Sequence, residues 1–174
     1  MLSQKMQGAL NDQINAEYHS SYLYLAMAAH CEAINLDGFG NWLRVQAQEE
    51  MVHAMKFFDF VLERGGRVEL KPVEGPPSSW ESPLAIFEAT LEHEQYITGR
   101  INKLVDLAIA ESDHASNAFL QWFVNEQVEE EATADAVLQQ LKLMQDAPGG
   151  LFMMDRELAT RTFTPPPAAG AGGA

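Results

Sequence analysis

Residues 39–61 read FGNWLRVQAQEEMVHAMKFFDFV, a segment with the periodicity of a partly buried helix. Its apolar residues recur at spacings of three and four, which places them on one face. The same face carries Glu50 and His53 at its centre, between Leu43 on one side and Phe57 on the other. A carboxylate inside an apolar face requires compensation, because burying an unpaired charge costs several kcal/mol.

Helix signals recur along the rest of the chain. We expect four long helices and a short fifth one, over residues 3–34, 39–64, 83–111, 114–147 and 151–160. Ser82 and Asp113 are suited to cap the third and fourth helices, and Pro83 suits a first helical position. Residues 65–82 contain three prolines, so we expect a non-helical connection there.

The connection over residues 65–82 is long enough to reach from one end of a helix bundle to the other. The second and third helices can then run parallel, as in one known class of bundle. The predicted fold is therefore an all-α four-helix bundle with a long crossover connection and a short fifth C-terminal helix. Residues 1–161 are expected to form one domain, and residues 162–174, rich in Pro, Ala and Gly, a disordered tail.

Each long helix is expected to bury a face that is apolar at both ends and carries a glutamate near its middle. The glutamates are Glu17, Glu50, Glu94 and Glu130. On the third helix the expected face consists of Leu84, Phe87, Leu91, Glu94, Thr98, Ile101 and Val105. These faces carry almost no basic residues, so the four carboxylates need another partner. Two divalent cations would balance their formal charge, and oxygen ligands with one imidazole suit iron or manganese.

The spacing of these residues repeats between the two halves of the chain. Glu50 and His53 follow Glu17 by 33 and 36 positions, and Gln127 and Glu130 follow Glu94 by the same intervals. Di-iron carboxylate bundles carry Glu-x-x-His on one helix of each pair. The first copy, residues 50–53, is complete. The second reads Gln127-Val128-Glu129-Glu130 and departs from the pattern.

Composition narrows the class of protein. The net charge of −14 argues against a nucleic-acid partner, which would need a positive surface. The single cysteine, Cys31, excludes an intrachain disulfide and argues against a cysteine-based zinc site. The apolar runs are too short to cross a membrane, and the chain does not open on a signal-peptide pattern. We therefore expect a soluble cytoplasmic protein.

Two segments carry a resemblance to a known family: AQEEMVH at residues 47–53 and FLQWFVNEQ at residues 119–127. Because of these two segments, the sequence resembles the non-haem bacterial ferritins over residues 2–161. The resemblance implies that the predicted four-helix bundle is ferritin-like. The resemblance implies a first iron held by Glu17, Glu50 and His53, and a second by Glu94, Glu130 and the bridging Glu50. It implies Gln127 beside the pair, as a hydrogen-bonding or weakly ligating group.

The resemblance further implies a third iron site nearby, formed by Glu49, Glu126 and Glu129 with Glu130 shared. It matches Tyr24 to the tyrosine placed next to the diiron centre. Both assignments have simpler alternatives. The three carboxylates can be solvated surface groups, and Tyr24 can be a core tyrosine whose hydroxyl is hydrogen-bonded.

The activity implied by the resemblance is iron storage with ferroxidase chemistry. Fe(II) binds at an intrasubunit diiron site, is oxidised by O2 or peroxide, and is deposited as ferric mineral in a hollow shell of twenty-four subunits. The fifth helix would point to a fourfold channel. Met51 occupies the place of the haem-ligating methionine of bacterioferritins. Haem is not expected, because bacterioferritins keep Glu-x-x-His in the second copy and residues 127–130 do not.

Three other functions predict features that distinguish them from iron storage. A rubrerythrin-like peroxidase usually has Cys-x-x-Cys pairs, which one cysteine cannot supply. A DNA-protecting mini-ferritin builds its sites between subunits and lacks a fifth helix. An acidic bundle that binds metal only for folding would form a small oligomer and take up no oxygen.

Overall fold

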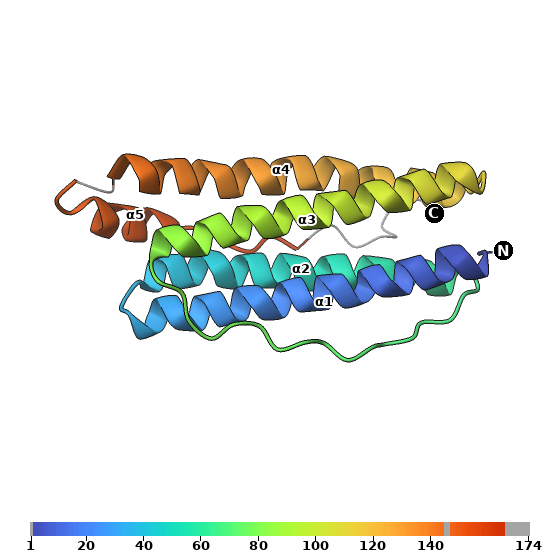
Figure 1. The fold of residues 1–174 in the computed structure, drawn as a ribbon, viewed down its shortest axis with the longest axis horizontal. Helices are drawn as coiled ribbons and strands as arrows, with labels where there is room; N and C mark the ends of the chain where they lie inside the picture. Colours follow the sequence, from blue (N-terminus) through green and yellow to red (C-terminus); the bar gives the residue numbers. More distant parts are fainter. Residues whose placement is uncertain (1, 145–146, 166–174) are drawn as a thin grey trace, which may run out of the picture.

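Four long helices form a bundle, and a short fifth helix lies at one end of it (Figure 1). The bounds are α1 Gln4–Ala33, α2 Asp37–Glu63, α3 Pro83–Ala110, α4 His114–Met144 and α5 Gly150–Leu158. The computed structural model describes residues 2–144 and 147–165. The all-α bundle with a short C-terminal helix is confirmed.

The expected tail lies mostly outside this range, since residues 166–174 are not among the described residues. Residues 162–165 are described and contain no helix. Among the described helices, none has the length and apolar character needed to span a membrane.

Side-chain caps start α3 and α4 where the sequence indicates. The Ser82 hydroxyl accepts the N–H of Ala85 at 3.1 Å, with Pro83 in the first turn. The carboxylate of Asp113 accepts the N–H of Ser116 at 3.1 Å. Each cap satisfies a backbone donor that has no partner within its own helix, and so fixes where the helix begins.

Residues 64–82 run along one side of the bundle from the end of α2 to the start of α3, so these two helices are parallel (Figure 1). The buried side chain of Asn11 on α1 holds this connection. Its amide donates to the carbonyl of Arg67 at 3.0 Å, and its carbonyl accepts the N–H of Glu69 at 2.9 Å. The chain thus consists of two antiparallel hairpins, α1–α2 and α3–α4, joined by a crossover.

The core is divided into two apolar clusters. One contains Phe39, Leu43 and Phe87 and lies toward α5; the other contains Leu10 and Phe57 and lies toward the opposite end. A buried polar layer lies between them: Glu17, Gln46, Glu50, His53, Glu94, Gln127 and Glu130, each at most 6% exposed. The four glutamates therefore lie in the middle of the bundle, where the sequence placed them.

The buried face of α3 differs from the expected one along one edge. Leu84, Leu91, Thr98 and Val105 are only half-buried, whereas Thr90, Ile97 and Leu104 are buried. Both edges satisfy a spacing of three or four from the central positions, so periodicity alone does not choose between them. The choice depends on the side from which the neighbouring helices cover α3.

The N-terminus of α2 is capped by a residue far away in sequence. Leu36, at its N-cap position, makes no side-chain cap. Instead, a carboxylate oxygen of Asp155 on α5 accepts the N–H groups of Gly38 at 2.8 Å and Phe39 at 3.1 Å. A Cβ added to Gly38 would lie 1.6 Å from the carbonyl oxygen of Asp155, so only glycine permits this approach.

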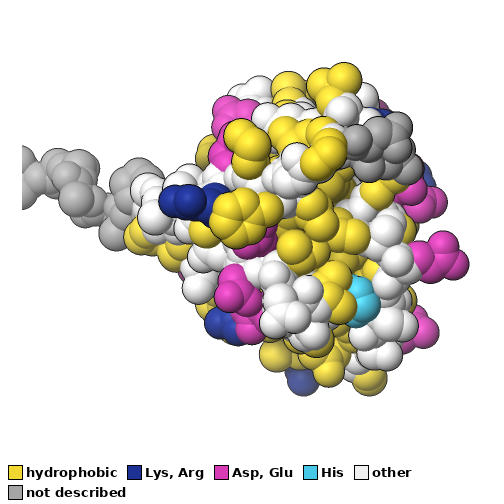
Figure 2. Space-filling model, turned by 90° about the vertical axis from the view of Figure 1, so that its left-hand side faces the viewer, with side chains coloured by type: hydrophobic (Ala, Val, Ile, Leu, Met, Phe, Trp, Pro, Cys, Tyr) yellow, Lys and Arg dark blue, Asp and Glu magenta, His cyan; other side chains and the backbone are white. Residues whose placement is uncertain are grey.

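The end of the molecule that carries α5 exposes apolar side chains. Figure 2 looks onto this end and shows hydrophobic side chains gathered near its centre. On α5, Phe152 and Met153 are 66% and 70% exposed, while Met154 is fully buried. A lone subunit would leave this apolar surface in water, which is typical of a face that contacts another protein.

We predict that Asp155→Ala lowers the free energy of unfolding by about 1 kcal/mol, because it leaves two N–H groups of α2 without an acceptor. The variant should also make α5 easier to cleave by limited proteolysis. Glu157→Ala is the matched control, since Glu157 is exposed on the same helix. Equal unfolding curves for the two variants would contradict the capping role.

Candidate metal centre

One group of possible ligand atoms is formed by Glu17, Glu50 and His53. One atom from each lies within 4.8 Å of the other two. Glu17 comes from α1 and the other two from successive turns of α2, at most 3% exposed. The structure thus brings together the three residues that the sequence analysis assigns to the first iron.

A second group consists of His53, Glu126 and Glu130, again within 4.8 Å of one another. His53 is common to both groups. Its ring packs edge-on against Trp122 and Phe123 of α4, with centroids 5.5 and 5.9 Å away. Aromatic packing on α4 therefore restricts the orientation of the imidazole that lies between the two groups.

Glu94 belongs to neither compact group and is held by hydrogen bonds. The hydroxyl of Tyr24 donates to one carboxylate oxygen. The amide of Gln127 donates to the other oxygen and to the backbone carbonyl of Glu94, both at 3.2 Å. Tyr24 and Gln127 are thus both in contact with Glu94, a proposed ligand of the second iron.

Two glutamines contact the glutamates, although the sequence analysis assigns neither a role. Gln46 donates to Glu130 at 2.6 Å and to Glu50 at 3.2 Å, so these two carboxylates share one nitrogen. Gln13 donates to Glu17 at 2.7 Å. Each glutamine precedes a ligand of its own helix by four positions, and the two are 33 positions apart. That repeated interval, shared with the ligands, could have identified them.

The residues expected to form a third iron site are only partly together. Glu49 forms a salt bridge with Arg161, a residue that follows α5. The distance between the nitrogen and the oxygen is 2.6 Å. The guanidinium of Arg161 also lies over the ring of Trp42 at 4.3 Å. Glu126 belongs to the second group, whereas Glu129 is exposed and lies in neither group. The third site remains a prediction.

Burial and mutual repulsion make the glutamates weak acids in the absence of cations. Burial, followed by the charge of Glu50, raises the pKa of Glu17 to about 8. Burial and then Glu94 raise the pKa of Glu130 to about 8. Burial, Glu94 and Glu130 together raise the pKa of Glu50 well above its usual value. Without metal, the carboxyl groups of the layer therefore tend to be protonated. Cations that bind there would displace these protons.

Two buried oxygens of the polar layer, Oε2 of Glu17 and Oε1 of Gln46, lack a hydrogen-bond partner among the described residues, and that of Glu17 belongs to a carboxylate. Among the residues that the structure describes, none donates to Oε2 of Glu17, although this atom is fully buried. A buried oxygen without a donor costs free energy unless another group compensates it. The donor set is carboxylate oxygens with one imidazole, which suits iron.

The comparisons with known proteins agree with this geometry. Residues 7–144 match the family model described as Ferritin-like domain. The chain belongs to the ferritin family. A bacterial non-heme ferritin of Bacteroides fragilis is 43% identical to it over 161 residues, which cover 92% of this chain and all of the relative. One of Staphylococcus aureus is 39% identical over 163 residues, covering 94% of this chain and 98% of the relative.

Solved ferritin structures match the whole bundle. A closed form of the ferritin of Archaeoglobus fulgidus, engineered by mutagenesis, is 55% identical and superposes with a TM-score of 0.93, covering 94% of this chain and all of the other. An open-pore ferritin from the same archaeon is also 55% identical, with a TM-score of 0.91, covering 92% of this chain and 98% of the other.

We predict that the chelator-treated protein becomes less stable as the pH rises. The folded-state pKa values of Glu17 and Glu130, about 8, exceed their ordinary value of 4.5. The folded state therefore keeps protons that the unfolded chain releases. Its free energy of unfolding should fall between about pH 4.5 and pH 8.

Urea denaturation across this pH range measures the effect. Glu17→Gln should flatten the pH dependence, because the amide stays neutral at every pH. Glu92→Gln is the control, since Glu92 is exposed on α3 and its loss changes only the overall charge. If the two variants give the same slope, the buried carboxyl groups are not the cause.

Proposed function

We propose that this protein stores iron and is a ferroxidase: it binds Fe(II), oxidises it with O2 and deposits the ferric product within a hollow oligomer. The observation that carries the proposal is the buried polar layer, in which four glutamates and His53 lie between two apolar clusters. Membership of the ferritin family and the two groups of ligand atoms support it.

We assign the first iron to Glu17, Glu50 and His53, whose ligand atoms lie within 4.8 Å of one another and whose side chains are all buried. The second iron would bind Glu94 and Glu130, with Glu50 as the bridge. Two hydrogen-bond contacts support the bridging role. Gln46 donates to both Glu50 and Glu130, so the bridge and a ligand of the second iron lie within reach of one nitrogen.

The chemistry follows from charge and proton balance. Two ferrous ions offset the four carboxylates, and the protons held by the metal-free glutamates leave as the ions bind. Each ferrous ion would then give one electron to O2, and the two electrons together would reduce O2 to the level of peroxide. The protein fixes the separation and charge of the ions, while the ions supply the electrons.

Tyr24 and Gln127 would keep Glu94 in place during this step. Both donate hydrogen bonds to its carboxylate, which leaves fewer orientations open to it. Tyr24 is fully buried at this position. Its hydroxyl can be oxidised and donates a hydrogen bond to Glu94, which supports a place beside the reacting ions.

A third site would overlap the second group, at Glu49, Glu126 and Glu129 with Glu130 shared. Glu126 already lies within ligand distance of His53 and Glu130, which supports a path for ions out of the centre. Glu49 forms a salt bridge with Arg161, so an ion that bound to this carboxylate would have to displace the guanidinium group.

The proposed assembly is a homo-oligomeric shell of twenty-four subunits in the cytoplasm. The exposed apolar residues of α5 support contacts between copies at that end of the bundle (Figure 2). Light scattering would then give twenty-four times the subunit mass of 19.3 kDa. A monomer or dimer at micromolar concentration would rule out a shell.

Anaerobic Fe(II) titration followed by exposure to O2 tests the activity. The wild type should bind two tight ions per subunit, or three if the third site exists, and oxidise them rapidly. Glu50→Ala removes the bridge and should slow oxidation by more than about 10-fold, while the oligomer still assembles. Glu92→Gln, an exposed charge change, should behave like the wild type.

Equal oxidation rates in the wild type and Glu50→Ala would remove the diiron assignment. Tight binding without oxygen uptake would instead indicate a bundle that uses metal only to fold. Neither result depends on the size of the oligomer, which is measured separately.

A further inference from the structure

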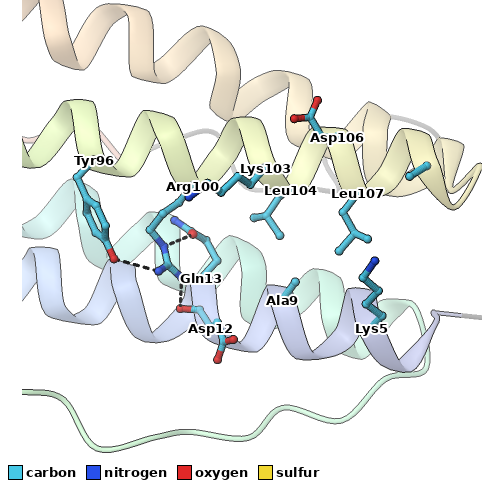
Figure 3. A pocket seen from close by; sticks show the side chains of 11 residues that line it. Lys5, Ala9, Asp12, Gln13, Tyr96, Arg100, Lys103, Leu104, Asp106 and Leu107 are labelled. Atoms are coloured by element: carbon cyan, nitrogen blue, oxygen red, sulfur yellow. Dashed lines mark hydrogen bonds between the residues drawn. The ribbon is translucent and has the colours of Figure 1, made fainter.

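An arginine on α3 is connected to the candidate iron centre through one glutamine. Figure 3 shows Arg100 reaching from α3 to α1, where its Nε donates to Oε1 of Gln13 at 2.9 Å. The amide nitrogen of Gln13 in turn donates to Oε1 of Glu17 at 2.7 Å. Arg100 itself makes no contact with Glu17; the glutamine amide lies between them.

Two further hydrogen bonds hold the side chain of Arg100 in place. One of its terminal nitrogens donates to the backbone carbonyl of Asp12 at 2.8 Å, and the other donates to the hydroxyl of Tyr96 at 3.1 Å (Figure 3). A backbone carbonyl on α1 and a side chain on α3 thus hold the planar guanidinium on both sides. The third donor, the Nε–H group, is directed at Gln13.

This arrangement decides which end of the Gln13 amide faces Glu17. A guanidinium has donors but no acceptor, so only the carbonyl oxygen of Gln13 can face Arg100. The NH2 group must then face Glu17. Without the arginine, the amide could turn over and present its oxygen to the carboxylate, and two acceptors would repel each other.

The orientation of Gln13 has a consequence for metal binding. Its NH2 group donates a hydrogen bond to Oε1 of Glu17, while Oε2 accepts none from the described residues. One oxygen is therefore held by the protein and the other is left for an ion. Hydrogen bonds to ligating carboxylates commonly fix the geometry of a metal site in this way.

We propose that Arg100 and Gln13 act together as positioning residues for Glu17, holding its carboxylate so that only Oε2 binds the ion. The inference rests on the proposed function in taking Glu17 as an iron ligand. Charge alone predicts the opposite effect of Arg100, because a nearby positive group disfavours cations. The sign of a mutational effect therefore separates positioning from electrostatics.

Binding of Co²⁺ to the chelator-treated oligomer tests the proposal, with calorimetry for affinity and the visible spectrum for coordination. Gln13→Met and Arg100→Met should each weaken binding at the site that contains Glu17 by about 10-fold and alter the spectrum. The double variant should be no weaker than Gln13→Met, because Arg100 acts through that residue.

Lys103→Met is the matched control. Lys103 lines the same groove between α1 and α3, carries the same charge as Arg100 and makes no hydrogen bond to Gln13 among the described residues (Figure 3). Its removal should leave affinity unchanged or slightly increased. Equal or tighter binding by Arg100→Met, or additive losses in the double variant, would overturn the proposal.

Oligomer size and thermal unfolding establish that each variant is folded before binding is compared. If Arg100→Met does not assemble, Gln13→Met decides the matter: unchanged affinity and spectrum in that variant overturn the inference. A wild type that binds no Co²⁺ would count against the proposed function itself. A wild type that binds it, with variants that bind equally well, would count only against the positioning role.

Discussion

Four carboxyl groups are buried in the middle of this bundle, and the structure around them depends on how their negative charge is compensated. Water cannot stabilise them there, and the buried layer contains no lysine or arginine among the described residues. Burial instead raises the pKa of Glu17 and Glu130 to about 8. The layer can therefore exist with bound protons or with bound cations, but is unfavourable as bare charge. This dependence suits the middle of the bundle to holding cations.

The surrounding structure keeps the carboxylates apart and oriented. Three glutamines, Gln13, Gln46 and Gln127, each donate to at least one glutamate from a neutral amide. Neutral donors suit this task, because a lysine or arginine in their place would compete with the ion for the site. Apolar clusters on both sides exclude water and hold the helices in register. Stability is thus carried by the two ends of the bundle, which leaves its centre available for chemistry.

Much of this could be predicted from the sequence, because the periodicity and the 33- and 36-residue intervals report directly on helix faces. The positions of Glu50 and His53 follow from their local helix, and the caps at Ser82 and Asp113 from local chemistry. Contacts between distant segments could not be predicted. The capping of α2 by Asp155, for example, depends on how α5 docks and leaves no local signal. The covered edge of α3 was likewise undetermined, since two edges satisfied the same periodicity.

The crossover over residues 64–82 divides the ligands between two hairpins that can each fold from contacts close in sequence. One hairpin supplies Glu17, Glu50 and His53, and the other supplies Glu94 and Glu130. Neither hairpin contains both halves of the centre, so a nascent or partly folded chain has no complete centre for two ions. Ferrous iron would meet its full set of ligands only after the hairpins have docked. The order of the chain would thereby delay the proposed oxidation of iron until the polypeptide has finished folding.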